Sequence, residues 1–126
     1  MLNKHDVGKL GELAAAKFLH KNGYKIIASN KHESHKEIDI IATDKEYIAF
    51  VEVKTRSVGY DMYSFYGPPS AAVTKKKQAN LITAARNYLK NNPTQKTPRM
   101  EVIEVYLKKG TDKVLKINHF TNAYHA

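Results

Sequence analysis

The sequence predicts an α/β domain in which helices pack on a mixed central β-sheet. Two apolar runs of high strand propensity, Glu37–Ala42 and Ile48–Arg56, are separated by a short polar turn. Two longer segments, Asn3–Lys21 and Lys75–Leu89, repeat their apolar residues every three to four positions, as amphipathic helices do. A chain of 126 residues with these patterns is expected to form one domain, residues 1–126, that is long enough to bury a core.

The first expected element is the helix Asn3–Lys21, which Asn22-Gly23 would end. Gly8 and Gly11 each cost such a helix about 1 kcal/mol relative to alanine, so a close approach to another element would explain them. Glu12 follows Gly11 among small and apolar neighbours, and the residues alone leave open whether its carboxylate is exposed or joins a site. The expected apolar face of this helix comprises Val7, Leu10, Leu13, Ala14, Phe18 and Leu19.

Three strands are expected to follow as a meander. Tyr24–Ser29 is the first, and Asn30–Lys36 is expected to be a polar turn. The two apolar runs joined by Thr43–Glu46 are the second and third strands. After the second helix, Arg99–Leu107 and Val114–Phe120 are expected to be the last two strands.

Charged residues interrupt both central strands. Asp39 lies in the first strand, and Glu52 and Lys54 lie in the second. Glu52 and Lys54 are two residues apart, so both side chains emerge on one face of an extended strand. Burying an unpaired charge is costly, so chemistry explains these residues more economically than packing does.

The segment Ser57–Pro69 has no sustained period and carries aromatic residues, including Tyr63 and Tyr66. We expect a loop that follows Lys54 closely enough to overhang the predicted site. Its tyrosines could stack on nucleic-acid bases, or they could equally fold back on the core.

Thr74 is expected to cap the second helix, whose first turn holds Lys75, Lys76 and Lys77. Cations at a helix N-terminus are unfavourable by a few tenths of a kcal/mol, and contact with phosphates would offset this cost. A solvated run of charge is the ordinary alternative explanation for such a cluster.

Composition narrows the class of function. Lysine and arginine number 21 against 12 acidic residues, and the net charge of +9 suggests a polyanionic partner such as nucleic acid, or else a solubilising surface. The absence of cysteine excludes disulfides, thiolate catalysis and cysteine-ligated zinc. No stretch reaches membrane-spanning length and the start is polar, so we expect a cytoplasmic protein.

The interrupting charges suit a hard divalent cation. Asp39 and Glu52 on adjacent strands could hold Mg²⁺, which prefers oxygen ligands and keeps several waters. The metal would polarise a phosphoryl oxygen, and Lys54 would orient the attacking water or stabilise the developing charge. With Glu12 as a third carboxylate, the set suits metal-assisted hydrolysis of phosphodiesters.

Several motifs in this order resemble the YraN family (uncharacterised protein family 0102). They are Gly8–Glu12, Asn30, Glu37–Ala42, Phe50–Arg56, Tyr66–Pro69, Ala72–Thr74, Lys77-Gln78 and Tyr88-Leu89. The resemblance implies a restriction-endonuclease-like three-layer fold, with a more distant similarity to archaeal Holliday-junction resolvases. It also implies an active site in which Asp39, Glu52 and Glu12 bind metal and Lys54 assists.

The expected function is therefore a Mg²⁺- or Mn²⁺-dependent DNA endonuclease that hydrolyses phosphodiester bonds, acting on branched or distorted DNA. The alternatives are a nucleic-acid-binding module without catalysis and a housekeeping interaction protein. Dimers are common among such folds, so a homodimer is included among the expected partners. The residues expected to contact nucleic acid are Arg56, Lys75, Lys76, Lys77, Gln78, Tyr63 and Tyr66.

Overall fold

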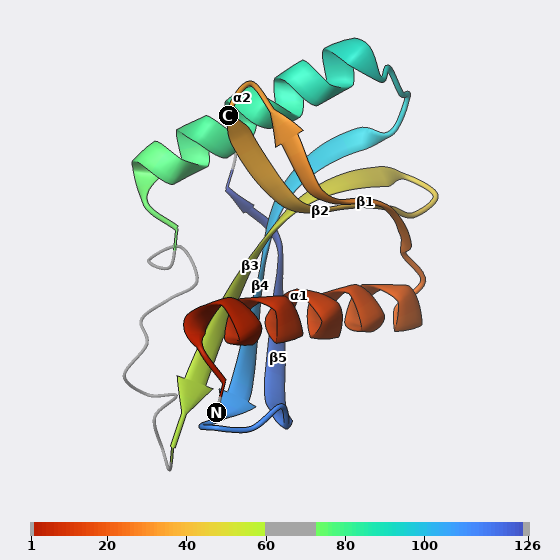
Figure 1. Ribbon diagram of the computed structural model, residues 1–126. Helices are drawn as coiled ribbons and strands as arrows, with labels where there is room; N and C mark the ends of the chain where they lie inside the picture. Colours follow the sequence, from red (N-terminus) through yellow and green to blue (C-terminus); the bar gives the residue numbers. More distant parts are fainter. Residues whose placement is uncertain (1, 60–72, 125–126) are drawn as a thin grey trace.

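The computed structural model describes residues 2–59 and 73–124 of the protein (Figure 1). Along this part of the chain a helix and three strands are followed by a second helix and two strands, in the order that the hydrophobic periodicity predicts. The elements are α1 Lys4–Lys21, β1 Lys25–Glu33, β2 Lys36–Thr43, β3 Tyr47–Val58, α2 Lys75–Asn91, β4 Thr97–Lys108 and β5 Val114–Tyr124.

The five strands form one mixed sheet in the order β1-β2-β3-β4-β5. The first three strands pair antiparallel, which confirms the predicted meander. The β3 and β4 strands pair parallel, because α2 carries the chain from one end of the sheet back to the other. The β5 strand then returns antiparallel to β4.

The two helices lie on opposite faces of the sheet (Figure 1). On one face, Ala15 and Leu19 of α1 pack against apolar residues of the central strands, including Val51. On the other face, Leu81 of α2 packs against a second cluster that includes Phe50. Successive β3 residues thus point to opposite helices, as the alternation of an extended strand requires. This three-layer arrangement confirms the predicted α/β class and is compatible with a restriction-endonuclease-like fold.

Local interactions hold α1 at its start and against the sheet. Asn3 Oδ1 accepts from the Asp6 backbone N–H at 2.9 Å, and Asp6 Oδ2 accepts from the Asn3 backbone N–H at 3.2 Å, which forms a capping box. Gly11 is buried where α1 meets Thr55 of β3, so a close approach accounts for this glycine. Leu13 was expected on the apolar face but is 60% exposed. It lies about half a turn away from the buried line of Gly11, Ala15 and Leu19.

The predicted turn at Asn30–Lys36 is wrong, because β1 continues to Glu33. Only Ser34 and His35, both with positive φ, form the turn before β2 begins. Glu33 is buried and accepts a hydrogen bond from the Asn87 amide of α2 at 2.8 Å. A contact between such distant segments extends the strand through residues that are locally polar.

The other strands are longer than predicted, and Ser57 and Val58 complete β3 instead of opening a loop. Tyr63, Tyr66 and the rest of the predicted aromatic loop from residue 60 onwards lie outside the described residues. Thr74 caps α2 as predicted, since its hydroxyl accepts from the Lys77 backbone N–H at 3.1 Å. Among the described residues, neither helix combines the length and hydropathy that spanning a membrane requires.

Candidate functional site

The candidate site lies where β2 and β3 diverge. The two strands pair only along Ile40–Thr43 of β2, and beyond Ile40 they separate (Figure 1). Asp39 is the first residue past the last pair, and its Oδ2 accepts from the Val53 backbone N–H at 2.8 Å. This side chain therefore replaces a backbone hydrogen bond of the sheet, and the fork holds its carboxylate in place.

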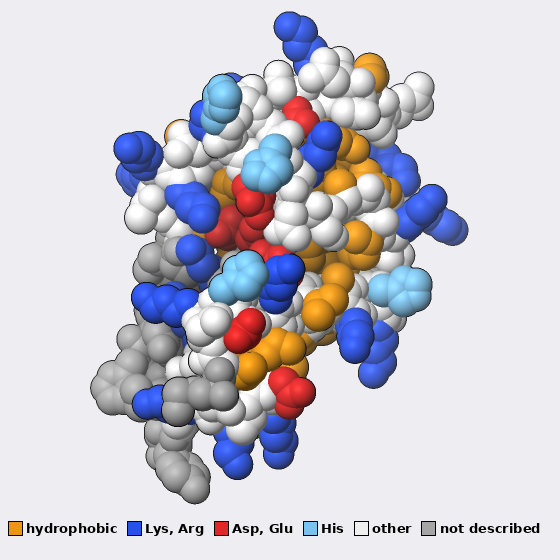
Figure 2. Space-filling model, in the orientation of Figure 1, with side chains coloured by type: hydrophobic (Ala, Val, Ile, Leu, Met, Phe, Trp, Pro, Cys, Tyr) orange, Lys and Arg blue, Asp and Glu red, His pale blue; other side chains and the backbone are white. Residues whose placement is uncertain are grey.

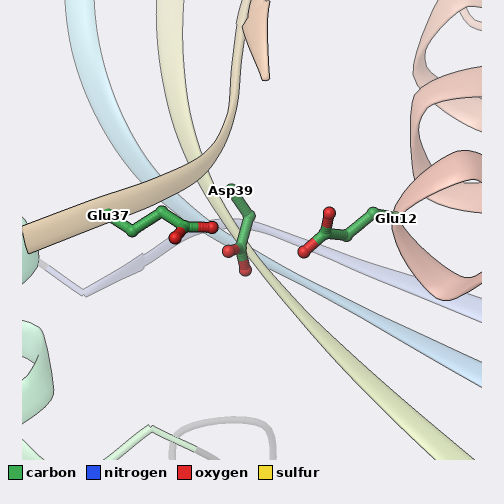
Figure 3. A group of neighbouring side chains, drawn as sticks. All are labelled: Glu12, Glu37 and Asp39. Carbon is green, nitrogen blue, oxygen red and sulfur yellow. The ribbon is translucent and has the colours of Figure 1, made fainter. Parts of the chain in front are cut away.

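Three carboxylates converge at this fork. Glu12 reaches it from α1, and Glu37 and Asp39 reach it from β2 (Figure 3). One oxygen from each of the three lies within 4.8 Å of the others. The close packing of Gly11 on Thr55 brings Glu12 here, where its side chain is half-buried beside the other two carboxylates. Glu37 had no predicted role, although its spacing of two residues from Asp39 on one strand was an available signal.

Glu52 lies on the α2 face of β3 and is 3% exposed. Its Oε1 atom is 2.9 Å from Lys77 Nζ and 3.7 Å from Lys54 Nζ. Its Oε2 atom is buried and has no hydrogen-bond partner among the described residues. The structure thus places Glu52 and Lys54 together, as their spacing predicts, and adds Lys77, which was expected to contact only nucleic acid.

Crowded negative charge alters the acidity of these groups. Burial, followed by the negative charge of Glu52, raises the pKa of Asp39 from 3.8 to about 7, although the Val53 hydrogen bond opposes the shift. Burial also raises the pKa of Glu12, with contributions from Glu37 and Glu52. Burial works against a charged Lys77, but its hydrogen bond to Glu52 and the surrounding carboxylates raise its pKa overall. The site therefore favours bound positive charge.

The donor set fits a hard divalent cation. Mg²⁺ takes oxygen ligands at about 2.1 Å, so two of its ligand oxygens lie up to about 4.2 Å apart. The carboxylate oxygens of Glu12, Glu37 and Asp39 are already gathered within 4.8 Å, so small side-chain movements would suffice. Carboxylates without thiolate or imidazole ligands suit Mg²⁺ or Mn²⁺ better than softer metals.

Basic side chains surround the acidic patch. Figure 2 shows the carboxylates gathered in one area between the two helices, with lysine, arginine and histidine side chains around it. Lys75 and Lys76 are exposed in the first turn of α2. The Gln78 amide donates to the Val73 carbonyl at 3.0 Å, so it anchors the start of α2. Arg56 is half-buried on β3 and has interaction partners of its own.

Two cavities flank Glu12. One, of about 610 Å³, runs from Glu12 past Gly8 and Thr55 to Lys109 in the β4–β5 turn. The other, of about 250 Å³, lies between α1 and the fork and is lined by Asn30 and Asp39 among others. Glu12 therefore lines two cavities along the side of α1.

A second buried charge network lies on the α1 face of the sheet. Glu101 is fully buried, with Arg99 Nε and His119 Nε2 each 2.6 Å from one of its oxygens. Arg99 also donates to the Tyr24 hydroxyl at 3.0 Å and stacks 4.0 Å above the Tyr47 ring centroid. Sequence reasoning did not find this network, because His119, Tyr24 and Tyr47 are distant in sequence from the Arg99–Glu101 pair on β4.

The family model and the similar proteins found for this chain all belong to one family. Residues 11–105 match the family model described as uncharacterised protein family UPF0102. A UPF0102 protein of Caldanaerobacter subterraneus subsp. tengcongensis is 43% identical over 125 residues, covering 98% of each chain. A UPF0102 protein of Acetivibrio thermocellus is 43% identical over 127 residues, covering 97% of this chain and 93% of the relative. One of Chlorobium phaeobacteroides is 39% identical over 124 residues, covering 95% and 94%. None of these names states an activity.

Proposed function

The chain belongs to the uncharacterised protein family UPF0102, as the YraN resemblance predicts, and from its site we propose a divalent-cation-dependent nuclease that hydrolyses DNA phosphodiester bonds. The observation that carries this proposal is the convergence of Glu12, Glu37 and Asp39 beside a buried Glu52 that holds two lysines. Burial, followed by the charge of neighbouring carboxylates, raises the pKa of both Asp39 and Glu12, and groups perturbed in this way cluster at functional sites.

Each residue has a chemical role in this proposal. Glu12, Glu37 and Asp39 would hold the cation, Mg²⁺ or Mn²⁺, which when bound supplies charge that polarises the phosphodiester and activates water. Lys54 presents an ammonium next to Glu52, where it can donate a hydrogen bond to a phosphate oxygen or to the attacking water. Glu52 keeps this ammonium in place, because its buried Oε1 atom pairs with both Lys54 and Lys77.

DNA is the proposed substrate because the site is a small acidic centre within a strongly basic chain. The net charge of +9 and the basic side chains around the site would attract the phosphate backbone. At the acidic centre, the bound cation would offset the repulsion between the carboxylates and the phosphate. The exposed Lys75 and Lys76, which precede Lys77 at the start of α2, are proposed to contact the DNA phosphate backbone. Branched or distorted DNA is the proposed structural preference, and a homodimer and a cytoplasmic location are proposed with it.

The test compares cleavage of linear, supercoiled and four-way-junction DNA with and without Mg²⁺ or Mn²⁺. We expect cation-dependent products from the wild type and a loss of about 100-fold or more in Asp39→Asn and Lys54→Met. Lys113→Met, which removes an exposed lysine in the β4–β5 turn, serves as the control with the same change of charge as Lys54→Met. Thermal unfolding of each variant checks that it is folded.

The other outcomes separate the alternatives. Equal cleavage by the wild type and both site variants would rule out the assigned residues. DNA binding without cleavage of any substrate would favour a binding module that lacks catalysis. Absence of DNA binding at moderate salt would leave an interaction protein whose basic charge serves solubility.

A further inference from the structure

The site's carboxylates fall into two groups with different partners. Within the described residues, Glu12, Glu37 and Asp39 make no ion pair with a lysine or arginine. Glu52 differs, because Lys77 and Lys54 both approach its Oε1 atom. Among these described residues, the ion pairs of the first group are limited to His32 Nε2, 3.8 Å from Glu37 Oε2, whereas Glu52 already has two lysine partners.

The start of α2 fixes the position of Lys77. Its backbone N–H is held by the Thr74 hydroxyl at 3.1 Å, and the next side chain, Gln78, is held by the Val73 carbonyl at 3.0 Å. Val73 is itself 1% exposed and belongs to the core under α2. The first turn is thus anchored at two points, and from it the Lys77 ammonium reaches Glu52 at 2.9 Å.

Charge and geometry then limit how many metal ions the site can accept. Four carboxylates (Glu12, Glu37, Asp39 and Glu52) carry up to four negative charges, which one divalent cation and the two ammonium groups of Lys54 and Lys77 would balance. A cation bound directly to Glu52 Oε1 would lie about 2.1 Å from this oxygen. The Lys77 ammonium already donates to the same oxygen from 2.9 Å, so the two would compete for it.

The remaining oxygen of Glu52 points to the same arrangement. Glu52 is 3% exposed, and its Oε2 has no hydrogen-bond partner among the described residues. A buried carboxylate oxygen without a partner is unfavourable, so a ligand at the site is expected to satisfy it. Water around a hydrated cation held by the neighbouring carboxylates would do so, because Mg²⁺ usually keeps several waters.

We propose that the site binds one divalent cation, held by Glu12, Glu37 and Asp39. The Lys77 ammonium, paired with Glu52, takes the position that a second cation would occupy. Glu52 is then a partner of lysine and water, and Glu37 replaces it as the third metal ligand. This inference rests on the proposed function, since it assumes that the site binds a divalent cation.

The test counts Mn²⁺ ions bound to the full chain by isothermal titration and by the electron paramagnetic resonance signal of free Mn²⁺. We expect one ion per wild-type chain and two per chain of Lys77→Met, with Lys77→Gln as a second variant that keeps a polar side chain. The matched control is Lys76→Met, which removes the same charge from the same exposed turn, and it should bind one ion. Glu37→Gln should weaken binding by about tenfold or more.

The outcomes distinguish this inference from the proposed function. Two ions bound by the wild type, one ion still bound by both Lys77 variants, or unchanged affinity in Glu37→Gln would overturn the inference and leave a metal-dependent site standing. A second ion in Lys76→Met as well would show that net charge, not the Lys77 contact, sets the number. No Mn²⁺ bound by a folded wild type would overturn the inference together with the metal dependence on which it rests.

Discussion

Two alanine substitutions in α1 measure how closely this helix must approach the sheet to deliver Glu12. A methyl group at Gly11 would lie 2.7 Å from Thr55 Cβ and 2.8 Å from Thr55 Cγ2, well inside ordinary contact distance. A methyl group at Gly8 would meet no described atom within 4 Å. Both changes gain about 1 kcal/mol of helix propensity, so this gain cancels in the comparison of the two variants. Only Gly11→Ala also incurs overpacking, which costs about 1–3 kcal/mol.

We therefore expect Gly8→Ala to be more stable than the wild type and Gly11→Ala to be less stable than Gly8→Ala by about 1–3 kcal/mol. Urea unfolding followed by circular dichroism measures both free energies of unfolding. Mn²⁺ affinity should fall in Gly11→Ala and not in Gly8→Ala, because Glu12 adjoins the displaced residue. Thr55→Gly removes the overlapping atoms, so in that background the difference should shrink. Equal stability of the two alanine variants would refute the close packing of α1 on β3.

Two further predictions concern buried charge. Because the pKa of Asp39 is raised from 3.8 to about 7, the folded chain binds this proton more tightly than the unfolded chain, and stability should fall as pH rises through that range. Without divalent cations at about pH 8, Asp39→Asn should exceed the wild type by on the order of 1–3 kcal/mol in urea unfolding, and a wild-type pH profile as flat as that of the variant would contradict this. Arg99→Met leaves the fully buried Glu101 with His119 as its remaining close partner, so it should lose about 3–5 kcal/mol of stability, and a loss below about 1 kcal/mol would show that His119 suffices.

The sequence pattern predicted an element correctly where the interactions that form it lie within a few residues. The helix predicted from residue 3 to 21 forms as Lys4–Lys21, because Asn3 and Asp6 cap it from within a single turn. Likewise Thr74 caps α2 as expected. The extension of β1 to Glu33 could not be read in this way, because polar residues there are paired with β2 and with Asn87 of α2. The aromatic loop with Tyr63 and Tyr66 lies outside the described residues and stays a prediction.

The sequence by itself determined the fold class, the family, and the shared face of Glu52 and Lys54, since spacing within one strand sets the direction of each side chain. Tertiary structure decided which groups meet across elements. The divergence of β2 from β3 gathers Glu37 and Asp39 at a fork, and the packing of Gly11 on Thr55 adds Glu12. The capped first turn of α2 positions Lys77 so that its ammonium pairs with Glu52. Spacing along the chain carries no information on such distances, because they depend on how separate elements pack.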